Sequence, residues 1–302
     1  MSKFFKVISI IMVLSLLVIV SGCSNNQEVS KDDDGLYVVT SISILSDITK
    51  EILGERGYVD YIVPRGEEPE EYEFIPSDFQ KTNYADLIIF NGYNLEPAME
   101  RAVKATSNKE IIFATNGITP IFLEGDSDLE DPHAWFNPIL VATYVENILD
   151  ALITKDPEGE KYYQENANNY TEKLIDLDLW IKDKVNNIPE ENRVLVISEN
   201  ALKYFGEAYG FEAVGIWELN SHEEGTPQQI SRVVNIVNDR NLPAIFVEST
   251  IDNRYMQTIS NETGVPIAGE IFTDALGNKG SGADNYIDMM KTNVNTFVKG
   301  LK

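Results

Sequence analysis

The stretch EKYYQENANNYTEKLIDLDLWIKDKVNN, residues 160–187, decides the fold because it is far longer than the elements around it. Its apolar residues recur at intervals of three and four, which places them on one face of a single helix. A helix of about 26 residues is about 40 Å long, enough to run beside two domains. We therefore expect residues 157–189 to form a rigid connecting helix. The buried face is expected to consist of Tyr163, Ala167, Tyr170, Leu174, Leu177, Ile181 and Val185.

On both sides of this helix, short β-branched runs alternate with helical patterns. Strands that alternate with helices of 10–18 residues indicate parallel βα units. Ser46 and Ser77 are expected to cap the first two of these helices. The expected strands are 36–42, 58–63, 86–92 and 110–115 before the long helix, and 193–198, 211–219, 244–250 and 266–272 after it.

The pattern therefore predicts an α/β fold, with two (β/α)4 lobes of parallel sheet joined by one long rigid helix. The N-terminal α/β lobe is expected at 36–156 and the C-terminal α/β lobe at 190–302.

The N-terminus has the pattern of an export signal. Lys3 and Lys6 precede an apolar run, 7–20, which is shorter than the roughly 20 residues that a membrane-spanning helix needs. We interpret 1–22 as a signal peptide. The sequence VSGC that ends at Cys23 resembles the bacterial lipoprotein cleavage box, in which the cysteine becomes lipidated. An incidental cysteine is the alternative.

Cys23 is the only cysteine, so no disulfide can form within the chain. The polar residues that follow lack apolar periodicity, and we expect 23–35 to be a flexible tether. Lipidation of Cys23 would hold the protein on the extracytoplasmic face of the cell membrane.

The charge balance excludes one class of partner. The full chain has a formal net charge of −25, and removal of 1–22 takes away two lysines and no acids, giving −27. Nucleic acid is therefore not expected as a partner, because binding it requires clustered Lys and Arg. No glycine-rich phosphate loop follows any expected strand, so nucleotide binding has no support.

Four residues near expected strand ends could bind a cation. Glu70 lies in the acidic stretch GEEPEEYEFIPSD (66–78), and His133 lies in DPHAWFNP (131–138). Glu199 follows the strand RVLVIS, and Asp274 follows the last strand in EIFTDAL. Ligands of α/β folds bind at the carboxyl ends of strands. The alternatives are a solvated acidic loop, a structural histidine, a first-turn acid and a turn aspartate.

Three carboxylates gathered beside one imidazole would repel one another unless a cation lay between them. Together they offer up to six oxygen donors and one nitrogen, a hard donor set that suits Mn²⁺ better than tetrahedral Zn²⁺. His222 is expected on the surface. Glu248 is expected either beside this site or in a buried contact with a helix.

Several of these stretches resemble the metal-binding lipoproteins of ABC uptake systems, the cluster A-I (zinc/manganese) solute-binding family. DPHAWFNP is similar to the family's DPHxWLDP motif. SENALKYFGEAYGF (198–211) and GIWELNSHEEGTPQQI (215–230) are similar to the manganese-type branch, and IFTDALGNKG (271–280) completes the match. The resemblance implies that His133, Glu199 and Asp274 are metal ligands.

The first motif departs from the family. The family's pattern, GxDPHxYEPxPSD, has a histidine after the first proline. In this chain Pro69 is followed by Glu70. We expect Glu70 to be the fourth ligand. The alternatives are Glu71 or Glu73 reaching the metal, or a three-residue site completed by water.

The resemblance implies a lipid-anchored, monomeric solute-binding protein that is not an enzyme. It would capture Mn²⁺, or alternatively Zn²⁺ or Fe²⁺, as a transported ligand and deliver it to an ABC permease and its ATPase. A surface adhesin is a second possibility. A metal-dependent hydrolase is the least supported, because the chain contains no HExxH pair and no nucleophile elbow.

Overall fold

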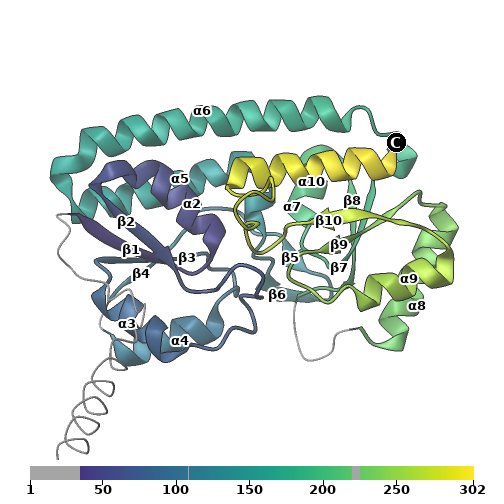
Figure 1. Cartoon of the computed structure of the whole chain (residues 1–302), viewed down its shortest axis with the longest axis horizontal. Helices are drawn as coiled ribbons and strands as arrows, with labels where there is room; N and C mark the ends of the chain where they lie inside the picture. The colour runs from purple at the N-terminus through teal and green to yellow at the C-terminus, as the bar shows by residue number, and fades with distance from the viewer. Residues whose placement is uncertain (1–34, 108, 220–224) are drawn as a thin grey trace, which may run out of the picture. The chain divides into compact units, whose positions relative to one another are not determined.

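Helix α6 (Glu160–Val185) runs beside both halves of the protein in this computed structural model (Figure 1). All seven apolar positions expected on its inner face are buried. The helix packs against α5 (Pro138–Lys155) and α2 (Ser43–Leu53), and farther along against α10 (Tyr286–Leu301). The prediction of one long helix lying along two βα regions is confirmed.

The structure describes residues 35–107, 109–219 and 225–302. The expected signal peptide, Cys23 and His222 lie outside these residues. Within them, no helix has the length and apolar character that crossing a bilayer requires.

The N-terminal half, residues 35–155, contains one parallel four-stranded sheet. Helices α2 and α5 cover one face, while α3 (Pro76–Tyr84) and α4 (Pro97–Thr106) lie on the other (Figure 1). Central strands of such a sheet are buried on both faces, which explains the continuous apolar run LIIF in β3. The strands in spatial order are β2 (Gly57–Tyr61), β1 (Leu36–Thr40), β3 (Leu87–Phe90) and β4 (Ile111–Phe113).

The C-terminal half, residues 194–302, differs from the expected single sheet. Outside the gap at 220–224, its four strands form two parallel pairs, β7–β8 and β10–β9, and β7 lies beside β9. Near the ends of β7 and β9, the Glu248 carboxylate accepts a hydrogen bond from the backbone N–H of Ser198. The strands are β7 (Val194–Glu199), β8 (Glu212–Trp217), β9 (Ile245–Glu248) and β10 (Ile267–Ile271), and the remaining helices are α7 (Lys203–Tyr209), α8 (Pro227–Arg240) and α9 (Arg254–Thr263).

The main hydrophobic core is continuous across both halves. It joins the N-terminal sheet and the inner face of α6 to C-terminal side chains such as Phe205 and Phe297. A second, smaller cluster lies in the C-terminal half and includes Val233 and Val237 of α8 and Met256 of α9.

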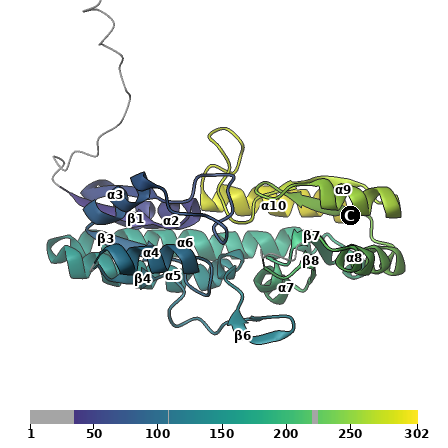
Figure 2. The same ribbon diagram turned by 90° about the horizontal axis from the view of Figure 1, so that it is seen from below.

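Two local predictions are wrong. Ser46 does not cap α2, which begins at Ser43, and Ser77 does not cap α3. Instead, the carboxylate of Asp78 accepts the N–H of Ile75 at 3.0 Å. The structure also contains an antiparallel hairpin that the sequence analysis did not predict, formed by β5 (Phe122–Leu123) and β6 (Asp126–Glu130) (Figure 2).

Candidate metal centre

Two of the four candidate ligands are positioned by the ends of strands, and the other two by loops. Glu199 is the last residue of β7, and Asp274 lies three residues after β10. His133 immediately precedes the short helix η2 (Ala134–Phe136), which leads into α5. Glu70 is on the loop between β2 and α3. Both halves of the protein thus contribute side chains to one place.

The side chains meet within a few ångströms. His133 Nε2 lies 3.5 Å from Glu199 Oε1 and 3.3 Å from Asp274 Oδ1. One ligand atom from each of Glu70, His133 and Glu199 lies within 4.8 Å of the other two. Since metal–oxygen and metal–nitrogen bonds are about 2.0–2.2 Å long, donors with these spacings can surround a single ion.

These donor atoms are buried, and within the part of the chain that the structure describes they have no hydrogen-bond partner. His133 and Glu199 have no exposed area and Asp274 is 1% exposed. Part of Glu70 is exposed, but both of its carboxylate oxygens are buried. Buried polar atoms without partners are rare, so several of them in one cluster require an explanation. A bound cation would satisfy Glu70 Oε1 and Oε2, His133 Nε2, Glu199 Oε1 and Oε2, and Asp274 Oδ1.

The electrostatics of the ion-free cluster favour bound protons. Burial and the Asp274 carboxylate raise the pKa of Glu70 well above its usual range, against the opposing effect of His133. Burial and the neighbouring Glu70 likewise raise the pKa of Glu199. Burial alone would lower the pKa of His133, but the Asp131 and Asp274 carboxylates raise it to about 10. A divalent cation would replace these protons.

The imidazole is held in place by Asp131, a role that was not predicted from the sequence. Asp131 Oδ1 lies 2.9 Å from His133 Nδ1 and also accepts the His133 backbone N–H at 2.9 Å. This leaves Nε2 directed toward the three carboxylates. Metal-binding histidines usually donate their second ring N–H to such a carboxylate. The signal was present, since Asp131 stands two residues before His133.

The carboxylates of the C-terminal half are held by short contacts. The hydroxyl of Thr273 donates to Asp274 Oδ2 at 2.8 Å, which leaves Oδ1 facing His133. Glu248 Oε2 accepts a hydrogen bond from the Ser198 N–H at 2.7 Å, one residue before Glu199 in β7. The structure therefore places Glu248 beside the cluster and at the backbone that carries Glu199.

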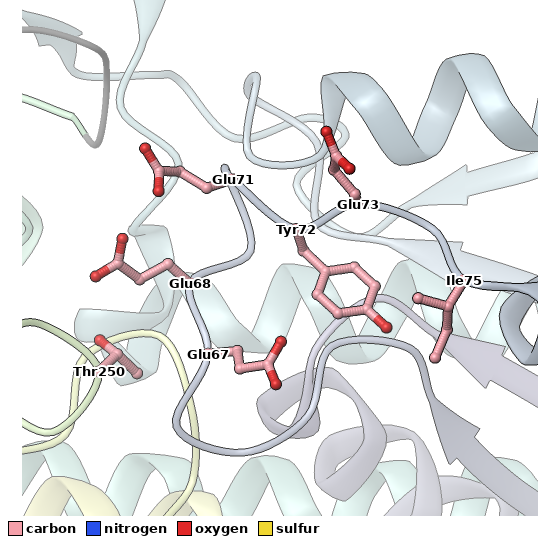
Figure 3. Close-up of a pocket in the computed structure, with 7 residues that line it drawn as sticks. All are labelled: Glu67, Glu68, Glu71, Tyr72, Glu73, Ile75 and Thr250. Carbon is pink, nitrogen blue, oxygen red and sulfur yellow. The ribbon is translucent and has the colours of Figure 1, made fainter.

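The other glutamates of the acidic loop lie outside the cluster. Glu71 and Glu73 are exposed, so the structure brings neither of the alternatives to Glu70 to the donor atoms. They line a neighbouring cavity of about 520 Å³ (Figure 3). Its other lining residues are Glu67, Glu68, Tyr72, Ile75 and Thr250.

Most of the chain matches one known protein family. Residues 38–300 match the family described as zinc-uptake complex component A, periplasmic (ZnuA). The chain belongs to this family. The resemblance inferred from the motifs is thereby confirmed. The ZnuA family and the relatives of this chain are substrate-binding transport proteins and not enzymes.

Relatives of this ZnuA-family chain are named for manganese. It is 54% identical over 293 residues to the manganese-binding lipoprotein MntA of Halalkalibacterium halodurans, covering 97% of each chain. It is 40% identical over 301 residues to the manganese ABC transporter substrate-binding lipoprotein PsaA of Streptococcus pneumoniae serotype 4, again covering 97% of each.

Solved structures confirm the fold class of the ZnuA-family chain. The periplasmic zinc-binding protein TroA of Treponema pallidum matches with a TM-score of 0.84 at 29% identity, over 88% of this chain and 99% of TroA. A Mn-bound periplasmic metal-binding protein of Candidatus Liberibacter asiaticus matches with a TM-score of 0.79 at 30% identity, over 88% and 100%.

Proposed function

We propose that this protein captures Mn²⁺ outside the cell and delivers it to an ABC permease. The observation that carries the proposal is the cluster of buried donor atoms without hydrogen-bond partners, to which both halves of the chain contribute. We infer that Glu70, His133, Glu199 and Asp274 coordinate the ion.

The donor set supports manganese as the cargo. Carboxylate oxygens outnumber the single imidazole nitrogen, and hard, oxygen-rich sites suit Mn²⁺. Affinity alone would not select it, because most sites bind Fe²⁺ and Zn²⁺ more tightly than Mn²⁺. Selectivity must therefore come from coordination number, geometry and metal supply. Zn²⁺ and Fe²⁺ are the alternative cargoes.

The names of the relatives support the transport role. They are described as ABC transporter substrate-binding lipoproteins, and such a component acts with a permease and an ATPase. We propose that 1–22 is a lipoprotein signal peptide and that lipidated Cys23 anchors the chain to the extracytoplasmic face of the cell membrane. The tether would be 23–35. The names describe metal transport, so adhesion is not part of this proposal.

We further propose a division of the folded part into an N-terminal lobe at 36–156, a connecting helix at 157–189 and a C-terminal lobe at 190–302. A monomer suffices for this role, since one chain supplies all four donors.

Elemental analysis of the full-length protein, purified in detergent without added metal, tests the proposal. The wild type is expected to retain one Mn per chain, and Glu70→Ala is expected to lose it. Glu71→Ala is the matched control, because this neighbour is exposed, and it should retain the ion. A wild type that contains no transition metal and binds none on titration would refute the proposal. Retention of Zn or Fe instead would reassign the cargo.

A further inference from the structure

Lys203, the first residue of α7, reaches from the C-terminal half into the contact with the N-terminal half. Its side chain is 11% exposed. The ammonium group lies 2.8 Å from Asp131 Oδ2 and 2.9 Å from Glu218 Oε2. A lysine this buried needs such partners, because removing its charge from water is unfavourable.

The position of Lys203 matters because Asp131 also holds the proposed ligand His133. One oxygen of Asp131 faces the His133 ring and backbone N–H, and the other accepts from Lys203. With both oxygens engaged, the carboxylate cannot turn without losing one partner. A cation supplied by the other half of the protein thus contacts the same carboxylate that holds the imidazole.

The outer end of this chain of contacts is fixed as well. Glu218 accepts the side-chain N–H of Asn200 at 2.8 Å and the backbone N–H of Glu124 at 2.7 Å. The neighbouring Tyr204 hydroxyl donates to the Asp131 carbonyl at 2.9 Å and accepts the Ile121 N–H at 3.0 Å. Residues of the C-terminal half thus hold the loop that carries His133 from two sides.

We propose that Lys203 is a positioning residue that holds His133 in its metal-binding orientation through Asp131, from across the boundary between the two halves. This inference rests on the proposed function. Its consequence is that the full donor set exists only while the halves are in contact. Separation of the halves would withdraw Lys203 from Asp131, release the imidazole and weaken the hold on the ion at the moment of delivery.

The sign of one substitution separates this role from simple electrostatics. Lys203 is a positive charge close to a cation site, so its Coulomb field opposes Mn²⁺ binding. If charge alone mattered, Lys203→Met would bind Mn²⁺ more tightly than the wild type. Positioning predicts the opposite, a loss of about 10- to 100-fold in affinity, which is the usual effect of removing a group that orients a metal ligand.

The experiment measures Mn²⁺ affinity of the full-length protein by competition with a fluorescent chelator. Lys203→Met is expected to bind at least about 10-fold more weakly, and Lys203→Arg is expected to restore most of the affinity. Lys182→Met is the matched control, since Lys182 also pairs with an aspartate, but with Asp178 of its own helix α6 and not with Asp131. Electron spin-echo spectroscopy of bound Mn²⁺ is expected to show a changed imidazole nitrogen coupling in Lys203→Met only.

A double-mutant cycle with Asp131→Asn tests the route of the effect. If Lys203 acts through Asp131, the double variant loses no more affinity than the worse single variant. Tighter or unchanged binding by Lys203→Met, or additive losses in the cycle, would overturn the inference. If Lys203→Met does not fold, Glu218→Gln is the second variant, because it weakens the ion pair that holds the Lys203 ammonium group. Glu218→Gln should weaken Mn²⁺ binding. Unchanged binding would count against the inference. A wild type that binds no Mn²⁺ would instead refute the proposed function.

Discussion

At the scale of single residues, His133 combines two properties that rarely occur together. It has no exposed area, and yet the carboxylates around it raise its pKa to about 10. Without a bound metal ion, both ring nitrogens of the imidazole are therefore protonated at neutral pH. The resulting positive charge balances part of the surrounding negative charge. A metal ion must displace the Nε2 proton, because only a free Nε2 lone pair can coordinate.

Binding of Mn²⁺ at pH 7 is therefore expected to release at least one proton. Isothermal titration calorimetry in buffers of different ionisation enthalpy measures this number directly. Affinity should rise with pH, because His133 and the carboxyl groups of Glu70 and Glu199, whose pKa values are raised, must give up their protons to bind the ion. His133→Gln should release fewer protons than the wild type. Heats that do not depend on the buffer would contradict this expectation.

Glu248 leads to a prediction about stability in the presence of a chelator. Burial and the Asp274 carboxylate raise its pKa from 4.5 to about 8, against the opposing Ser198 N–H. A carboxyl group with a raised pKa stabilises the fold when protonated, and this contribution is lost as pH rises from about 4.5 through 8. Urea unfolding should show the wild type losing stability relative to Glu248→Gln between pH 5 and pH 8.

Glu248→Ala provides the contrast. It leaves the Ser198 N–H without its acceptor, which should lower the free energy of unfolding by about 1–3 kcal/mol relative to Glu248→Gln. Equal stabilities of the two variants would show that the contact contributes nothing.

At the scale of elements, the contribution of α6 to the stability of the fold depends on the packing of its inner face. Leu177 is 2% exposed and Leu179, two residues later, is 59% exposed. Leu177→Ala should lower the free energy of unfolding by about 2–5 kcal/mol, because it leaves a cavity in the main core. Leu179→Ala, its matched control, should change it by no more than about 0.5 kcal/mol. Chemical denaturation of both variants measures the difference, and similar losses would contradict the packing described for α6.

The acidic loop before α3 should affect how fast the ion arrives. Three glutamates of this loop line the cavity beside the cluster, and a group of like charges attracts counter-ions. They are Glu67, Glu71 and Glu73. Replacing the three by Gln should slow Mn²⁺ association at low ionic strength in stopped-flow measurements. The difference should shrink at 1 M salt, where charges are screened within about 3 Å. Equal association rates at low salt would show that the loop does not steer the ion.

The alternation of strands and helices could be predicted because each element has its own period of apolar residues. The hairpin of β5 and β6 could not, since the strand DSDLE is poor in the residues that favour strands. Its one signal was Gly125, which adopts a φ of 85° at the turn. The division of the C-terminal strands into two pairs depends on tertiary contacts between β7 and β9, which no local pattern specifies.

Glu199 and Asp274 could be placed together from sequence because each follows an expected strand, and parallel strands end at one edge. Their distances from the His133 ring, 3.5 Å for Glu199 and 3.3 Å for Asp274, agree with that reasoning. The pairing of Lys203 with Asp131 could not be foreseen. The two residues are 72 positions apart, and only the packing of one half on the other brings them into contact.

At the scale of the whole molecule, the continuous core indicates that both halves unfold together. Side chains from the N-terminal sheet, from α6 and from the C-terminal half belong to one hydrophobic cluster. Urea unfolding of the metal-free protein should therefore show one transition that is the same by fluorescence and circular dichroism. Two separated transitions would show that the halves are independent.

Mn²⁺ should stabilise that single folded state. At a free concentration 100 times its Kd, the ion should raise the free energy of unfolding by about 2.7 kcal/mol, since it binds only the folded protein. A chelator should reverse the shift, and Mg²⁺ at the same concentration serves as the control. The absence of a shift would argue that the cluster does not hold the ion.

The position of Glu70 has a consequence for how such receptors diversify. Three of the clustered side chains are almost completely buried, whereas Glu70 stands on a loop that joins β2 to α3 at the surface. Under the proposed coordination, exchange of this residue would alter the donor atoms offered to the metal ion and leave the hydrophobic interior intact. We therefore expect that a single codon change at this position could retune nutrient preference without redesign of the scaffold that carries it.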